Sequence, residues 1–390
     1  MISGQNPPQT ERTRRYDVDW LRVFGMMTVF LFHNNRFFDT DGWHVKSAQT
    51  SQASMIVTVF AVQWMMPLFF ILSGIGIYHA LAHQEWRQYL VSRVKRLLVP
   101  FLFGVFVIIA PLQVYLERVS NKQFEGSFWS FYPHYFEGWY GLSGNFAWMG
   151  IHLWYLEFLF VFSVITLPLF LYLRSPSGSP IVGSVTRFLG KPWRVFLLAL
   201  PIGVVEFIAG LPPIRDSIFG NEGFGGWSAL PYLTLLIIGY VLATDESLVR
   251  TMERHRVPAL LAGVVSFILA GLAYKASEPW SLVSRELLMS LLRGILCWSW
   301  LMAIFGFAGR YLRFSNRFLK YANEAVLPFY ILHQTVILCV GFYVLRLHTY
   351  LWLEYLIIAT ISFALIMAVY ELLIRRVNAL RILFGMKAVR

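Results

Sequence analysis

The sequence predicts an all-α integral membrane protein with about ten transmembrane helices and with both termini in the cytoplasm. The first observation is composition: 57% of the 390 residues are hydrophobic and only 14% are charged, whereas soluble domains are about 45–50% apolar and about 25% charged. The second is a series of ten apolar stretches, each near the roughly 20 residues that a helix needs to cross a bilayer. The third is an alternation of lysine and arginine content from one loop to the next.

The predicted membrane domain covers 17–375, between a cytoplasmic tail over 1–16 and a basic cytoplasmic tail over 376–390. The first tail lacks a signal-peptide pattern, so the first span is expected to act as an uncleaved insertion signal. The second span holds Pro67 and is longer than a bilayer requires, which predicts a kinked or tilted helix. The ten spans are expected at approximately 20–38, 54–82, 97–116, 152–173, 193–210, 228–244, 257–274, 286–308, 324–345 and 350–374.

The placement of lysine and arginine predicts the orientation. Of the 33 such residues, 22 lie in the tails and alternate loops and seven lie in the other five loops. Cytoplasmic loops carry the excess of positive charge, so both termini are expected inside, which an even number of spans allows. Polar turns mark two span ends: Thr244-Asp245 after the sixth span and Asn323-Glu324 before the ninth.

Several function classes lack a signal in the sequence. The net charge of +12 comes mainly from lysine and arginine in the tails and alternate loops. It is therefore explained by membrane topology, and no nucleic-acid-binding module is visible. No zinc-ligand spacing, phosphate-binding glycine loop or nucleophile elbow occurs, so no metal site is expected. The two cysteines lie at different expected depths, which argues against a disulfide. No internal repeat is visible, which weakens the case for an inverted-repeat transporter.

The first span, with its flanks Asp17 to Asp39, is unusual because it carries polar residues at membrane depth. Arg22 and His33 are eleven residues apart, close to a whole number of turns, so both project from one helix face at a separation of about 16 Å. Polar side chains in a membrane usually face the protein interior or a water-filled cavity. One face of this helix is therefore expected to line a polar path, although a satisfied core histidine is the alternative for His33. The polar residues that follow it are Asn34, Asn35 and Arg36.

Four further ionisable residues are expected in the spans, between the midplane and the outer leaflet: Glu157, Glu206, Arg293 and His333. Each would be costly alone in lipid, and a shared cavity would offset this cost. A structural ion pair between Glu206 and Arg293 is the alternative.

Arg93 and Arg96 form a second candidate site before the third span. They are three residues apart and share a helix face. Two adjacent guanidinium groups suit a phosphate-bearing ligand, whereas the alternative is ordinary positive charge flanking a cytoplasmic helix end.

The loop over 117–151 is long and rich in aromatic residues. It is interpreted either as a belt at the membrane interface or as a sugar-stacking lid over the outer mouth.

The chain resembles acyltransferase family 3 of bacterial membrane enzymes, within the branch of glucan biosynthesis protein C. The resemblance covers roughly 15–387 and rests first on Arg22 and His33 in the first span and on the Arg93-x-x-Arg96 pair. Many members place a serine–tyrosine pair before the ninth-span histidine, where this chain has a different arrangement of Ala325 and Tyr330. The supporting stretches are FFILSG over 69–74, HLWYLEFLF over 152–160 and LPFYILHQ over 327–334.

The resemblance implies a ten-helix enzyme of the bacterial inner membrane that moves an acyl group from cytoplasmic acyl-CoA to a hydroxyl of an extracytoplasmic carbohydrate. It implies His33 as the catalytic base and Arg22, Arg93 and Arg96 as residues that bind the acyl donor. No cofactor is expected to be bound permanently, and no fused extracytoplasmic hydrolase-like domain is expected, because the given sequence ends soon after the last span. A transporter or flippase for a glycan or small metabolite is the alternative, since the same polar cavity would serve it. The candidates for contacting substrate or the oxyanion are Asn34, Asn35, Arg36, Glu157, Glu206, Arg293 and His333.

Overall fold

The computed structural model of the chain describes residues 15–217 and 219–389. These residues form α-helices (α) and short 3₁₀ or π turns (η), with no β-strand among them. The first half of the chain contains α1 Tyr16–Asn35, α2 Gln52–Val62, α3 Met65–His83, α4 Trp86–Arg93, η1 Val94–Leu98, α5 Val99–Phe106, α6 Ile109–Ser120, α7 Phe128–Phe131, η2 Tyr132–Phe136, η3 Ile151–Leu153, α8 Trp154–Ile165 and α9 Leu167–Arg174. The second half contains α10 Ser179–Leu189, η4 Arg194–Leu198, α11 Ala199–Gly210, α12 Ala229–Leu242, α13 Glu246–Arg254, α14 Arg256–Ala276, α15 Leu282–Tyr311, α16 Arg317–Val344, η5 Leu345–Leu347, α17 Leu351–Val369, η6 Tyr370–Ile374 and α18 Asn378–Leu383.

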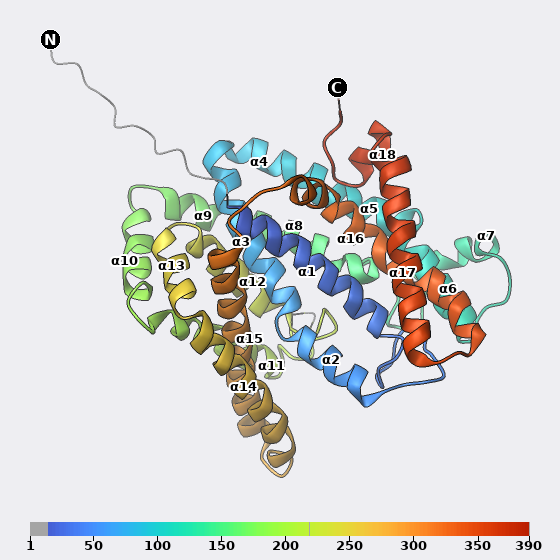
Figure 1. Cartoon of the computed structure of the whole chain (residues 1–390), viewed down its shortest axis with the longest axis horizontal. Helices are drawn as coiled ribbons and strands as arrows, with labels where there is room; N and C mark the ends of the chain where they lie inside the picture. The colour runs from blue at the N-terminus through green and yellow to red at the C-terminus, as the bar shows by residue number, and fades with distance from the viewer. Residues whose placement is uncertain (1–14, 218, 390) are drawn as a thin grey trace.

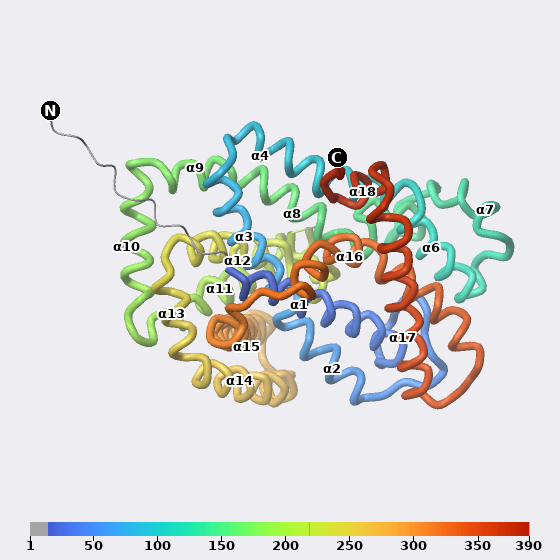
Figure 2. Tube along the Cα trace, turned by 45° about the horizontal axis from the view of Figure 1, so that its top comes forward, coloured from blue at the N-terminus to red at the C-terminus, as the bar shows by residue number. Residues whose placement is uncertain are grey.

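Helix α1 lies in the middle of the molecule. Figures 1 and 2 show it between α3 and α12 on one side and α16 and α17 on the other. Twelve of its 20 residues are buried, including Asp17 and Asp19. Because neighbouring helices surround it, its polar side chains face protein rather than lipid, which is the usual arrangement for such groups in membranes.

Prolines explain three interruptions of predicted spans. The second span is interrupted at Gln63 and Trp64, just before Pro67 in the first turn of α3. Proline lacks the N–H that would bond to the carbonyl four residues earlier, so this interruption agrees with the expected kink. Pro111 and Pro168 lie in the same way near the starts of α6 and α9, and the axes of α8 and α9 differ by 48°.

The all-α membrane fold is confirmed. Six helical runs in the described part of the chain are long and apolar enough to cross a membrane, and counting three bent helix pairs as one span each raises the number to nine. Helix α1 is not among them, because polar residues lie at both of its ends: Asp17, Asp19 and Arg22 in its first two turns and His33, Asn34 and Asn35 in its last turn. The count of ten spans and the cytoplasmic location of the termini stay predictions. The six runs are Gln52–His83, Trp86–Ser120, Arg256–Ala276, Leu282–Tyr311, Arg317–Leu347 and Leu351–Ile374.

One predicted boundary was wrong. Asn323 and Glu324 lie inside α16, which begins at Arg317 after Asn316, whose side chain accepts a hydrogen bond from the backbone N–H of Leu319. Helix α16 begins about two turns before its apolar stretch. Asn323 and Glu324 therefore mark the start of the apolar stretch and not the start of the helix.

The aromatic region over 117–151 has its own small core. Phe131 of α7 and Tyr135 of η2 are buried against Ala110 and Val114 of α6. Trp129 remains 75% exposed. The region is therefore a folded cap packed on α6, with some aromatic rings left at the surface.

Two glycines allow α3 and α12 to pack closely. A Cβ added at Gly74 would lie 2.0 Å from the carbonyl oxygen of Leu236, and one added at Gly239 would lie 2.2 Å from that of Ile71. Small residues permit such close backbone contact between membrane helices. This packing fixes the position of α3 relative to α12, and α3 also packs against α1.

Candidate active site

A cavity of about 1060 Å³ lies beside the first half of α1. Its wall combines α1, α3, the α4–η1 segment, α8, α16 and the residues around and after α18. Along α1 the lining runs from Arg22 to Val29, a rise of about 10 Å. Charged side chains line part of the cavity, and apolar side chains such as those of Met26 and Val29 line the rest. This combination suits an elongated ligand with an anionic part and an apolar part.

Positive charge dominates the cavity wall. Seven lysine or arginine residues line it together with one carboxylate, that of Glu324. An excess of one sign of charge in a cavity attracts ligands of the opposite sign. The seven residues are Arg22, Arg93, Lys95, Arg96, Lys320, Arg381 and Lys387.

Arg93 and Arg96 line the same cavity, as their predicted common face requires. They lie at the junction of α4 with the π turn η1, and π turns occur frequently at functional sites. The guanidinium of Arg93 lies 4.7 Å from the ring centroid of Tyr89, and its Nε is buried without a hydrogen-bond partner. Neither arginine forms an ion pair with any described carboxylate. Both retain hydrogen-bond donors for a ligand.

Arg22 lies farther along the cavity on α1. Its Nη1 is 3.1 Å from Asp19 Oδ1, which also accepts a hydrogen bond from Asn323 at 3.3 Å. This pairing fixes part of the Arg22 side chain while the residue still lines the cavity.

His33 and His333 are brought together at the other end of α1. The Nδ1–H of His333 donates to the carbonyl of Tyr330, which leaves its Nε2 as an acceptor. That Nε2 lies 3.1 Å from His33 Nδ1, which is also 3.0 Å from the carbonyl oxygen of Val29. A carbonyl can only accept, so these partners assign the proton of neutral His33 to Nδ1 and leave a lone pair on Nε2.

His152 extends this pair into a buried network that sequence reasoning missed. Its ring centroid lies 5.0 Å from that of His333. His152 Nε2–H donates to the Ile331 carbonyl at 3.2 Å, while Nδ1 accepts from Gln113 Nε2 at 3.1 Å. Gln113 also donates to Thr335 at 2.8 Å. The HLWYLEFLF stretch contains His152, but nothing in its spacing indicated contact with α16.

Comparison with known proteins identifies the family. A family model described as an acyltransferase domain matches residues 15–371. The chain belongs to acyltransferase family 3. Similar proteins named Glucans biosynthesis protein C, from Escherichia coli strains SMS-3-5 / SECEC, O139:H28 (E24377A / ETEC) and K12, are each 25% identical to it, and the alignments cover 96% of this chain and 95% of each relative. No solved structure gives a significant match. The predicted resemblance is confirmed, and the chain is a membrane acyltransferase.

Tyr155 and Ser73 place two hydroxyl groups in the cavity of this acyltransferase. Their oxygens are 2.7 Å apart, and both residues line the cavity together with Tyr330. The rings of Tyr155 and Tyr330 lie 5.8 Å apart, and Tyr330 lies next to His333. The pair is therefore a source of hydrogen-bond donors near the histidines that was absent from the predicted site.

A polar cluster lies beyond Trp43, whose ring centroid is 6.3 Å from that of His33. The next residue, His44, forms an ion-pair contact with Glu117, and Tyr140 donates to Glu117 at 2.6 Å. Burial, followed by the neighbouring carboxylate, raises the pKa of the Tyr140 hydroxyl. This cluster connects the loop after α1 to the aromatic region over 117–151.

Glu206 and Arg293 are paired with each other away from the cavity. Arg293 Nη1 lies 2.6 Å from Glu206 and 3.1 Å from Glu222. Its guanidinium also lies 4.3 Å from the Trp227 ring centroid and donates to the Gly226 carbonyl. This geometry corresponds to the alternative expectation that Glu206 and Arg293 form a structural ion pair.

The remaining predicted candidates contact other elements. Asn34 donates to a carbonyl of α17, and Asn35 donates to two oxygens of α2. Arg36 pairs with Asp39 at 2.6 Å. Glu157 lies on α8 with Oε2 buried and unbonded among the described residues, and it does not line the cavity. The structure thus brings His33 and His333 together, and Arg22, Arg93 and Arg96 together, but not these residues.

Proposed function

We propose that this membrane acyltransferase moves an acyl group from cytoplasmic acyl-CoA to a hydroxyl of an extracytoplasmic carbohydrate, with His33 as general base. The observation that carries the proposal is the cation-lined cavity whose wall reaches Val29, one helical turn before His33. Coenzyme A joins a phosphorylated nucleotide to a long arm that bears the thioester. Such a donor matches a cavity with cations and an apolar extension beside a base.

The phosphate groups of the donor would bind Arg93 and Arg96, whose guanidinium groups have free donors. Arginine binds phosphate through paired, charge-assisted hydrogen bonds. The arm would then extend along α1 past Arg22 toward Val29. The position of the cations supports phosphate binding at this end of the cavity, because Arg93, Lys95 and Arg96 of the α4–η1 segment line it together with the C-terminal residues Arg381 and Lys387.

The chemical step follows from the tautomer of His33. Its Nε2 would accept the proton of the acceptor hydroxyl while that oxygen attacks the thioester carbonyl carbon. The carbon–sulfur bond would then break, and the imidazolium would return the proton to the leaving thiolate, which departs as coenzyme A. General-base assistance contributes about 10²–10⁴-fold. Direct transfer needs no covalent intermediate, and no described serine, threonine or cysteine side chain hydrogen-bonds to His33.

The acceptor is proposed to be a glucan or another envelope glycan. The similar proteins carry the name Glucans biosynthesis protein C, and the orientation predicted from lysine and arginine places the loop with Trp43 on the extracytoplasmic side. A cytoplasmic donor and an envelope acceptor would locate the enzyme in the inner membrane.

The test uses the purified full-length chain in proteoliposomes with radiolabelled acyl-CoA and a periplasmic glucan. Label should move to the glucan, and His33→Ala should lower the rate by about 10²–10⁴-fold with unchanged thermal unfolding. The matched control is His83→Ala, because His83 is exposed and does not line the cavity. Label that stays on coenzyme A with the wild type, or near-normal turnover by His33→Ala, would refute the proposal.

A further inference from the structure

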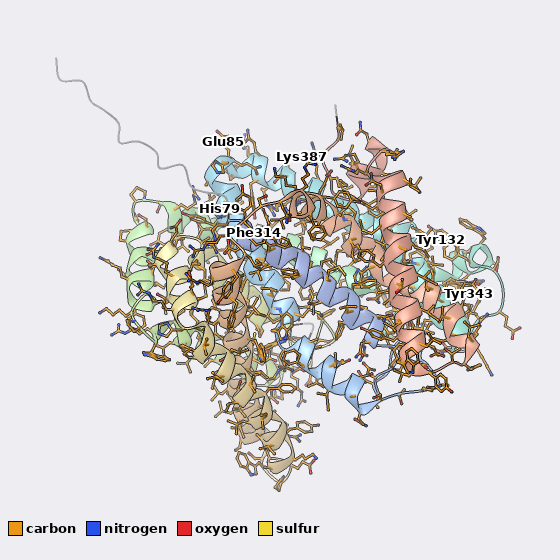
Figure 3. The ribbon with its side chains drawn as sticks, in the orientation of Figure 1. His79, Glu85, Tyr132, Phe314, Tyr343 and Lys387 are labelled. Atoms are coloured by element: carbon orange, nitrogen blue, oxygen red, sulfur yellow. The ribbon has the colours of Figure 1, made fainter. Side chains whose placement is uncertain are left out.

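The segment from Asn378 to Val389 forms part of the cavity wall although it lies beyond residue 371, where the match to the family model ends. Figure 1 shows α18 and the end of the chain beside α5. Figure 3 places Lys387 at the same edge of the molecule as Glu85, the residue before α4. The residues of this C-terminal segment that line the cavity are Arg381, Ile382, Gly385, Met386, Lys387 and Ala388.

The C-terminal segment is seated directly on the arginine-bearing turn. Phe384 is buried, and its ring centroid lies 5.6 Å from that of Phe103 in α5. Gly385 has φ +71°, and a Cβ added there would lie 2.8 Å from the carbonyl oxygen of Arg96 and 2.6 Å from the Leu327 side chain. Only glycine satisfies both the backbone conformation and this close approach. The position of the segment is therefore coupled to that of Arg96.

Arg381 fixes the backbone that carries Lys387. Its side chain is buried, and its Nε donates to the Lys387 carbonyl at 2.7 Å while Nη2 lies 3.2 Å from Glu324. Asn378 and Val389 close the segment with two hydrogen bonds of 2.8 Å. Arg381 is thus engaged within the protein, so it acts as a positioning residue rather than a ligand.

The Lys387 side chain remains available. It is exposed at the cavity and forms no ion pair with any described residue. Coenzyme A carries two separate anionic groups, a pyrophosphate and a ribose phosphate. Arg93 and Arg96, three residues apart on one turn, can serve one of these groups. The other lining cations without a described ion pair are Lys95, which lies on the same turn, and Lys320 and Lys387, which lie on different segments. Of these, Lys387 is carried by the segment that packs against the carbonyl of Arg96.

We propose that the C-terminal segment is a wall of the donor site and that Lys387 binds a phosphate group of coenzyme A. The inference rests on the proposed function, in which coenzyme A delivers the acyl group. It assigns a ligand-binding role to Lys387, which lies outside the residues matched by the family model. It also implies that the contacts of Arg381 are needed for full donor affinity, because they position the backbone of Lys387.

The experiment measures coenzyme A binding to the detergent-purified full-length chain by isothermal titration calorimetry at low salt. Lys387→Gln should weaken binding by about two- to fivefold, the range for one exposed charged contact. The matched control is Arg376→Gln, since Arg376 is an exposed cation of the same tail that does not line the cavity. It should bind coenzyme A as the wild type does.

A second variant tests the wall independently of the charge. Gly385→Ala should displace the segment and weaken coenzyme A binding at least as much as Lys387→Gln, whereas Gly271→Ala, with no atom within 4 Å of the added Cβ, should not. Wild-type affinity in both Lys387→Gln and Gly385→Ala would overturn this inference and leave the donor proposal intact. Failure of the wild type to bind coenzyme A would overturn the donor proposal, and the inference with it.

Discussion

His333 offers the sharpest test of how the base is oriented. Its Nε2 accepts from His33 Nδ1 at 3.1 Å, and this contact helps to hold the His33 ring with the Nε2 lone pair free to act as the base. His333→Leu removes the acceptor. His333→Gln is the matched variant, because a glutamine amide can place an acceptor oxygen near the position of the histidine Nε2.

The expected magnitude is modest. A neutral hydrogen bond of this kind contributes about 0.5–1.5 kcal/mol, and each 1.36 kcal/mol corresponds to tenfold in rate. The Val29 carbonyl, 3.0 Å from the same nitrogen, still favours the correct tautomer in the variant. His333→Leu should therefore lower kcat by about two- to tenfold, well short of the loss in His33→Ala, and His333→Gln should recover most of it.

The assay is steady-state transfer of label from acyl-CoA, with kcat and KM for the donor determined separately. A positioning role predicts a lower kcat with unchanged KM, because His333 does not line the cavity proposed for the donor. It also predicts that His333→Leu has no further effect in a His33→Ala background, since residues that act through one another are not additive. An equal rate loss in that background, or a change confined to KM, would refute the reasoning.

The remaining predictions concern charge and capping. Arg93→Gln and Arg96→Gln should each weaken coenzyme A binding, and the loss should shrink as salt rises because screening already weakens the wild type; titration calorimetry at two salt concentrations checks this. Arg293→Met should leave its carboxylate partner buried and unpaired, costing about 3–5 kcal/mol of stability, seen as a lower Tm with normal transfer per folded molecule. Asp245→Ala should remove the α13 cap and cost about 1 kcal/mol at neutral pH. Burial alone would raise the pKa of Asp245, but hydrogen bonds from Ser247 and Thr186 and the charge of Arg250 outweigh it and lower the pKa. The part of the cost that depends on the ionised carboxylate should therefore be present above about pH 4 and be lost as the pH falls through the lowered pKa, as followed by thermal unfolding.

Much of the fold could be predicted because lipid imposes simple rules. Apolar length and charge asymmetry predicted an all-α membrane protein, and Pro67 predicted the interruption before α3. The start of α16 could not be read in this way, because a helix continues into water as long as its backbone hydrogen bonds are capped. Asn316 provides that cap two turns before Asn323, and a lone asparagine in a polar stretch does not stand out.

The candidate site was predictable only where its residues share one helix. Arg22 and His33 on α1, and Arg93 and Arg96 on one turn, follow from helical periodicity. The contact between His33 and His333 joins residues 300 positions apart. The contacts of His152 and Tyr155 depend on how η3 packs beside α16 and how α8 packs beside α3. Helical periodicity predicts which residues share one face of a helix, but it does not predict which other helix packs against that face.

Hydrogen-bond saturation separates the structural arginines of this protein from those that can bind a ligand. The Arg293 guanidinium contacts two carboxylates, a carbonyl and an indole ring. Its hydrogen-bond donors are therefore engaged within the protein. Arg93 and Arg96 face a cavity without any described ion-pair partner. A cluster of unpaired cations is repulsive in the empty protein, and a polyanionic ligand relieves that repulsion on binding. Substitutions should therefore divide cleanly: changes at Arg293 should lower stability, whereas changes at Arg93 or Arg96 should lower donor affinity without lowering the Tm of the ligand-free protein.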